Sequence, residues 1–114
     1  MNALFTTLSM IAAANPAGFT YNVYNNGMQT SGFAVALACT QNSHGADGLE
    51  SVINVVTSGT TGATCVGGWL DTETGLYYYD ATVIFTDREA AIAFGRLQKQ
   101  IAIFDLDNLE EIRL

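Results

Sequence analysis

The amino-acid sequence predicts an α+β fold, with a mostly antiparallel sheet of four to six strands and about three helices packed largely on one face. Short runs rich in aromatic and β-branched residues lie between turn signals, and three other stretches place apolar residues at helical spacing. The chain has 114 residues, 49% of them apolar, so residues 1–114 are expected to form one domain with a single core. Residues 18–58 and 66–99 share a strand–strand–helix plan, so two such units are an alternative description.

The first predicted elements are a helix, a hairpin and a buried strand. Apolar residues recur at helical spacing over residues 3–14, and Pro16 ends that helix because the residue before a proline avoids the α region. Asn26-Gly27 between two apolar runs predicts a type I′ turn, in which both central residues need positive φ. Residues 33–39 are nearly continuous in apolar character, which predicts a central strand covered on both faces.

Two further helices are predicted from capping boxes. Asp47 is followed three residues later by Glu50, and Thr86 is followed in the same way by Glu89. The second of these helices is expected to end near Gln98. The predicted buried stripes are Leu49, Val52, Ile53 and Val56 in the first helix, and Ala90, Phe94 and Leu97 in the second.

The second half of the chain predicts a hairpin and a returning strand. Residues 65–70 form the first strand and residues 71–75 the turn. Residues 101–106 form the strand that closes the sheet, and residues 112–114 add a short edge. Two consecutive glycines at positions 67–68 indicate a bulge or a close approach of the backbone.

Alternation along the strand after this turn gives its two faces different characters. Tyr77 and Tyr79 lie on the apolar face, whereas Tyr78 and Asp80 lie on the opposite one. If that opposite face is covered, the carboxylate of Asp80 needs a hydrogen-bond donor. Trp69 on the paired strand completes an aromatic cluster, which serves either cross-strand core packing or a recognition surface.

The charge of the chain excludes several kinds of partner. Eleven acidic and four basic residues give a net charge of −7, so the chain lacks the basic surface that a protein needs to bind nucleic-acid phosphates or anionic membranes. An acidic surface suits a basic protein partner, or serves solubility alone. No charged side chain precedes Asp47, and this uncharged first half is compatible with a homodimer interface.

Metal, cofactor and membrane sites are not expected. One His and the isolated Cys39 and Cys65 make a poor ligand set, and no phosphate-binding motif is present. The cysteines are expected to be buried reduced thiols, with one disulfide as the alternative. No apolar run reaches the ~18 residues of a membrane span. The start of the chain lacks the Lys or Arg of a signal peptide, so a cytoplasmic location is expected.

The polar loop in the first half offers one candidate catalytic constellation. Ser43 and His44 are neighbours, with Cys39 and Asp47 nearby, but adjacency in sequence does not bring a base within reach of a nucleophile. His44 is therefore interpreted as a loop residue that, together with Gln41, contributes to a binding surface or a pocket.

Carboxylates at the second hairpin offer another candidate. Asp71 and Glu73 flank its turn and, with Asp80, are candidates for a paired-carboxylate site, which requires environments that push two pKa values apart. Because residues in a turn are solvated, Asp71 and Glu73 are expected to contribute to binding rather than to catalysis. Asp80 interrupts the tyrosine strand, and it too is expected to contribute to binding.

One pattern in the second half resembles a known set of proteins. It comprises Gly-Gly-Trp at residues 67–69, Tyr-Tyr-Tyr-Asp at residues 77–80 and Gln-Ile-Ala-Ile at residues 100–103. In this pattern the chain resembles short uncharacterised proteins encoded by phages and other bacterial mobile elements. The resemblance implies an accessory protein that works inside a bacterial cell, and such proteins often inhibit host defence.

These observations favour a small acidic binding protein without catalytic activity, which blocks a basic surface of a host defence nuclease in the manner of anti-restriction or anti-CRISPR proteins. One alternative is a protein that binds a nucleotide or metabolite, or a small enzyme. Another is a structural or oligomerisation module. The predicted binding residues are Gln41, His44, Trp69, Asp71, Glu73, Tyr78 and Asp80.

Overall fold

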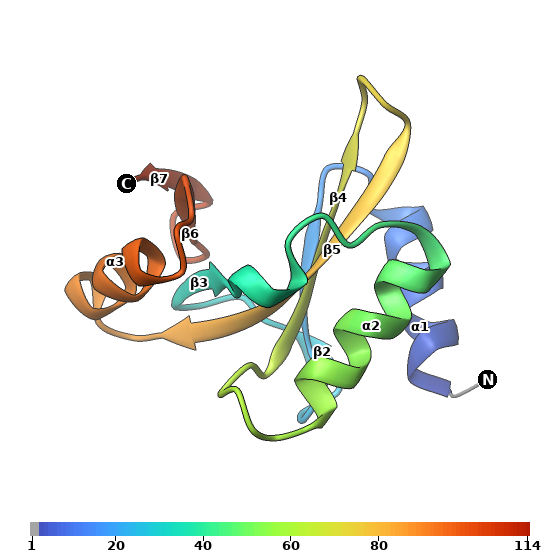
Figure 1. The fold of residues 1–114 in the computed structure, drawn as a ribbon, viewed down its shortest axis with the longest axis horizontal. Coiled ribbons are helices and arrows are strands. Elements are labelled where there is room, and N and C mark those ends of the chain that lie inside the picture. The colour runs from blue at the N-terminus through green and yellow to red at the C-terminus, as the bar shows by residue number, and fades with distance from the viewer. Residues whose placement is uncertain (1–2) are drawn as a thin grey trace.

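The computed structural model describes residues 3–114, and this range contains three α-helices, one 3₁₀ helix and seven strands (Figure 1). The elements in chain order are α1 (Ala3–Ala14), β1 (Phe19–Asn22), β2 (Gly27–Met28), β3 (Phe33–Ala36), η1 (Ala38–Thr40), α2 (Gly45–Thr57), β4 (Cys65–Asp71), β5 (Leu76–Phe85), α3 (Arg88–Leu97), β6 (Ala102–Asp105) and β7 (Glu110–Arg113). The predicted α+β class is confirmed, with one strand more than the predicted range.

The strands of residues 3–114 form one antiparallel sheet in the order β2-β1-β4-β5-β3-β6-β7. The ten-residue β5 pairs with β4 along one side and with β3 along the other. Because β4 and β5 lie between β1 and β3, residues 18–58 and 66–99 interleave in the sheet instead of forming separate units. In Figure 1 the β4–β5 hairpin projects beyond the rest of the sheet.

The helices cover one face of the sheet, as predicted. α2 lies across β4 and β5, α1 packs against α2, and α3 lies on β3, β5 and β6. The strand register places Tyr79 and Ala81 of β5 on this face, beside Val66 of β4. Leu8 of α1 and Val52 of α2 are fully buried against them. Each such aliphatic side chain stabilises the fold by about 1.5–3 kcal/mol relative to its exposed state.

Two helices begin at residues other than those predicted. α2 begins at Gly45 with His44 at its N-cap, and the His44 side chain forms no capping hydrogen bond. Gly45 has a φ of 67°, which favours glycine, and this sharp entry places Asp47 inside the first turn instead of at the cap. α3 is capped one residue later than predicted, by Asp87, whose carboxylate accepts a hydrogen bond from the Ala90 N–H at 2.9 Å. The predicted apolar stripe of α2 is confirmed as buried: Leu49, Val52, Ile53 and Val56.

The buried face of α3 is not the predicted one. Ala91 and Gly95 are buried and Phe94 is half-buried, whereas Ala90 is exposed and Leu97 is 72% exposed. A Cβ atom at position 95 would come within 2.8 Å of side chains of β6 and of the last residue of the chain. Gly95 thus allows a close approach of helix and sheet, and this approach turns Leu97 away from the core.

Two predictions for the first-half strands are wrong. The strand predicted at residues 33–39 ends at Ala36, and the following η1 exposes Cys39. Asn26 has a φ of 55°, but the glycine after it does not have positive φ. The turn is not of type I′, because residues 23–26 rather than two residues join β1 to β2.

Candidate functional site

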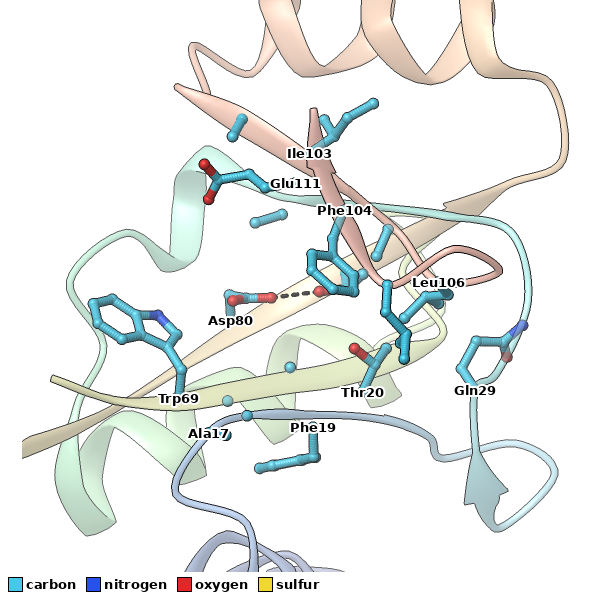
Figure 2. Close-up of a pocket in the computed structure, with 18 of the residues that line it drawn as sticks. Ala17, Phe19, Thr20, Gln29, Trp69, Asp80, Ile103, Phe104, Leu106 and Glu111 are labelled. Carbon is cyan, nitrogen blue, oxygen red and sulfur yellow. Dashed lines mark hydrogen bonds between the residues drawn. The ribbon is translucent and has the colours of Figure 1, made fainter. Parts of the chain in front are cut away.

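The face of the sheet opposite the helices surrounds a hollow of about 770 Å³ (Figure 2). Its floor is formed by the middle strands, where small residues leave space: Ala34 and Ala36 of β3 and Gly67 of β4. Residues of β1 and β2 line one side, and residues of β6 and β7 line the other. The prediction that β3 is covered on both faces is therefore wrong, because its Ala34 and Ala36 face this hollow.

Asp80 of β5 lines the hollow, and its carboxylate oxygen Oδ1 accepts a hydrogen bond from the Thr82 hydroxyl. Gly67 lies opposite Asp80 in the neighbouring strand, and a Cβ atom there would lie 2.7 Å from Asp80 Oδ1. Burial raises the pKa of Asp80, and the hydrogen bond from Thr82 offsets part of that effect. Within residues 3–114 no basic side chain forms an ion pair with Asp80. A half-buried carboxylate with a single hydroxyl donor lacks the cation that would offset its desolvation.

The charged side chains that line the hollow are acidic. Asp80 is joined by Glu111 of β7, which pairs with the exposed Arg113 at 3.4 Å. In the part of the chain that the structure describes, no Lys, Arg or His lines the hollow. With the net charge of −7, this arrangement attracts cations and repels anions.

Large apolar side chains surround the acidic floor. Among the exposed apolar residues of the described range 3–114, four line the hollow: Leu109 is 75% exposed, Trp69 48%, Met28 46% and Phe104 38%. Figure 2 shows the Trp69 ring on one side of Asp80 and the Phe104 ring on the other. A concave apolar surface of this kind, exposed to water, is typical of a binding site for a partner or ligand.

An aromatic stack continues from the hollow along the same face. The Trp69 and Tyr78 rings are stacked, with centroids 5.3 Å apart and an interplanar angle of 19°. His44 packs edge-on against Tyr78 at 5.5 Å, and a backbone bridge holds these two residues together. Tyr77 and Tyr79 contact Phe19 on the opposite, helix-covered side, so the predicted division of the three tyrosines is confirmed.

Cys65 lies in β4, two residues before the floor residue Gly67, and is a buried free thiol, as predicted. Burial raises the pKa of Cys65 to about 11, and the Asp80 charge adds to the rise while a hydrogen bond with Thr64 opposes it. The thiol is therefore protonated at neutral pH, and it is a poor nucleophile. Cys39, predicted to be buried, is exposed and free.

The structure brings together four of the predicted binding residues and separates three others. Trp69, Tyr78 and His44 form the stack, and Asp80 lies beside Trp69 in the hollow. The other three do not line the hollow: Gln41 and Glu73 are exposed, and Asp71 is the last residue of β4.

The candidate paired-carboxylate site does not form. Asp71 lies opposite Leu76, four residues along β5 from Asp80, which is about 13 Å at the rise of a strand. Pairs of catalytic carboxylates lie closer together, at about 5–9.5 Å in glycosidases. Instead, Asp71 stabilises the hairpin turn, because its carboxylate accepts a hydrogen bond from the Glu73 N–H at 3.0 Å.

Sequence reasoning missed contributions to both sides of the hollow, from β2 on one side and from β6 and the turn after it on the other. Met28 and Leu109 belong to short segments without clear periodicity, and no sequence signal marks them. Phe104 alternates with the buried Ile103 in β6, so its position on the opposite face was detectable from a period of two. Its proximity to Trp69 depends on the strand order, which the sequence does not reveal.

Comparisons with known proteins found no match. No family model matches the chain, and neither a curated protein nor a solved structure matches it. In residues 3–114 there is no group of three or more His, Cys, Asp or Glu side chains that is able to hold a metal ion, and no helix long and apolar enough to span a membrane. The chain is an α+β protein whose sheet is covered by helices on one face. The other face carries an open hollow with an acidic floor and apolar side chains around it.

Proposed function

We propose that the protein is a small, non-catalytic binding protein that docks a basic protein partner in the hollow. The observation that carries the proposal is the combination of an exposed apolar rim with lining charges that are all acidic in the described chain. Apolar rings at an interface contribute most of the binding energy, and complementary charges raise the association rate and the specificity.

The chemistry around the hollow supports binding more than catalysis. The Cys65 thiol stays protonated at neutral pH because its pKa is raised to about 11. The His44 ring packs against Tyr78, and no hydrogen bond joins it to Ser43 among the described residues. A nucleophile needs a base within hydrogen-bond reach, and these two groups do not supply that arrangement.

We propose that the partner is a host defence nuclease and that the protein belongs to a phage or another mobile element acting inside a bacterial cell. Nucleases bind phosphate backbones through Lys and Arg, so their substrate surfaces are basic. A protein with a net charge of −7 complements such a surface and competes with nucleic acid for it. The resemblance in residues 67–69, 77–80 and 100–103 supports this assignment.

The proposal is tested by adding the purified protein to a panel of restriction and CRISPR nucleases and measuring DNA cleavage. Wild-type protein is compared with Trp69→Ala in the hollow and with the control Leu97→Ala on α3, because both side chains are large, apolar and exposed. We expect a nuclease that wild type and Leu97→Ala inhibit and that Trp69→Ala inhibits at least tenfold less well. A binding partner that Trp69→Ala captures as well as wild type contradicts the proposal, as does a panel in which no nuclease is inhibited.

A second candidate is a binding protein for a small ligand. The observation in its favour is the volume of about 770 Å³, which lies within the range of small-molecule sites. A thermal-shift panel of nucleotides, polyamines and metabolites separates the two candidates, since a ligand that binds the folded state raises its melting temperature. A concentration-dependent shift that is lost in Trp69→Ala supports the second candidate, and a flat panel excludes the tested compounds.

A further inference from the structure

We infer that the hollow receives an arginine side chain of the partner, with the Asp80 carboxylate as its counter-ion and the Trp69 and Phe104 rings beside its guanidinium group. The inference rests on the proposed function and names the chemical group that the partner inserts. It follows from the charge, the aromatic walls and the room available in the hollow.

Asp80 has no cationic partner in the described part of the chain. Asp80 sits in a restricted space next to Gly67, receives one hydroxyl hydrogen bond from Thr82, and forms no ion pair within the described chain. Glu111 is already paired with Arg113, so Asp80 is the acidic lining residue without a cation. An incoming cation offsets the desolvation of this carboxylate, whereas a neutral ligand leaves it unpaired and an anion is repelled.

Two aromatic rings form walls beside Asp80. Trp69 and Phe104 both line the hollow with exposed rings, on two sides of Asp80 in Figure 2. A guanidinium group is planar, weakly hydrated and stacks on aromatic faces, while its N–H groups donate to a carboxylate. An ammonium group is more strongly hydrated and gains less from such walls, so the hollow favours arginine over lysine.

The hollow has room for more than one side chain. Small residues at positions 34, 36 and 67 keep the floor open, and the hollow of about 770 Å³ exceeds the volume of one side chain. An arginine therefore enters together with the residues that flank it. Their contacts fall on Met28 and Leu109 at the rim.

The test uses the fluorescence of Trp69, which is the single tryptophan of the chain and lies in the hollow. The probes are the peptides Ac-Gly-Arg-Gly-NH₂, its lysine counterpart, and its citrulline counterpart, a neutral isostere of arginine. At constant ionic strength we expect a saturable change with the arginine peptide, binding several-fold weaker with the lysine peptide, and no saturation with citrulline. Equal binding of the arginine and citrulline peptides overturns the inference, as does the absence of saturation with arginine. Equal binding of the lysine and arginine peptides overturns the choice of arginine.

Two charge variants are compared in the same titration. Asp80→Asn removes the carboxylate in the hollow, and Glu50→Gln removes one negative charge from the exposed side of α2 and preserves the hollow. Losing a charged hydrogen bond is expected to weaken arginine binding about tenfold or more in Asp80→Asn and to leave Glu50→Gln near wild type. Equal weakening in both variants attributes the binding to net charge and contradicts the role of Asp80. If Asp80→Asn does not fold, the citrulline comparison decides the question on wild-type protein.

The outcomes separate this inference from the proposed function. A partner that is lost in Trp69→Ala but kept in Asp80→Asn leaves the hollow as the docking surface and refutes the arginine assignment. A partner that both variants bind as well as wild type refutes the docking surface itself.

Discussion

Alanine at two adjacent glycines of β4 tests the asymmetry of the sheet. Gly68 faces the covered side, where an added Cβ would lie 2.5 Å from Phe19 Cε1 and 2.7 Å from Tyr77 Cε1. Both rings are fixed, because Phe19 is 8% exposed and the Tyr77 hydroxyl donates a hydrogen bond to the Asn15 carbonyl oxygen at 2.7 Å. Gly67 faces the hollow, where the added Cβ would meet the carboxylate of Asp80, the movable end of a side chain.

The magnitudes follow from two opposing effects. Overpacking costs about 1–3 kcal/mol, with the upper end for rings that cannot move. Replacing glycine by alanine in a strand returns roughly 0.5–1 kcal/mol. Gly68→Ala is therefore expected to lower the free energy of unfolding by about 2 kcal/mol, and Gly67→Ala to change it by less than about 1 kcal/mol.

Urea denaturation of both variants at 25 °C measures these changes, and thermal melts provide a check, because about 2 kcal/mol corresponds to roughly 8 °C in a domain of this size. The two variants control for each other, since each adds one methyl group to the same strand. If Gly67→Ala is as destabilised as Gly68→Ala, the hollow is filled in solution and the assignment of an open face is wrong.

Four variants, one of them a control, address packing and charge. Phe94→Ala is expected to lower the free energy of unfolding, measured by urea denaturation, by about 3 kcal/mol, because Phe94 packs against both core clusters. The control Leu97→Ala on the same helix is expected to change it by less than about 0.5 kcal/mol, because Leu97 is exposed. Equal losses in the two variants would refute the orientation of α3. Asp80→Asn is expected to raise the melting temperature at pH 7, because burial raises the pKa of Asp80 and the charged carboxylate destabilises the fold above that pKa. The difference in melting temperature between variant and wild type is expected to shrink as the pH falls toward ~4, where Asp80 is protonated in both the folded and the unfolded protein. Asp105→Asn is expected to act in the opposite direction, because the side-chain hydrogen bond from Asn108 lowers the pKa of Asp105. Desolvation opposes this effect, and backbone hydrogen bonds from Asn108 and Asp107 add to it, so the net pKa lies below the usual value. The stability that Asp105 contributes is present above ~4 and is lost as the pH falls through its folded pKa, so the deficit of Asp105→Asn shrinks in acid. Melting curves from pH 3 to 8 distinguish these two signs.

Sequence periodicity correctly predicted which side chains face the core in α2 and in β5. The stripe of Leu49, Val52, Ile53 and Val56 was confirmed, because one helical face meets one sheet face. The alternation from Tyr77 to Asp80 gave the correct faces of β5, because side-chain direction in a strand depends on its period alone. Leu97 was misplaced because the glycine at position 95 determines how α3 approaches the sheet, and that approach involves residues distant in sequence.

Some residues of the candidate site could also be predicted from local sequence, and others could not. Trp69, Tyr78 and Asp80 were identified from one hairpin, since their shared face follows from local alternation. Phe104 and Met28 were not identified, because they reach the hollow from strands at opposite ends of the sheet. A prediction of the hollow required the strand order β2-β1-β4-β5-β3-β6-β7, which no local pattern encodes.

The central claim, that a cationic group docks in the open face of the sheet, is tested most directly by NMR. Backbone amide shifts of ¹⁵N-labelled protein are followed during titration with Ac-Gly-Arg-Gly-NH₂. The largest shifts are predicted at Gly67, Trp69, Asp80 and Phe104, and they should disappear with the citrulline peptide. The largest shifts on α3 around Leu97, or shifts of the same size with both peptides, would contradict the account.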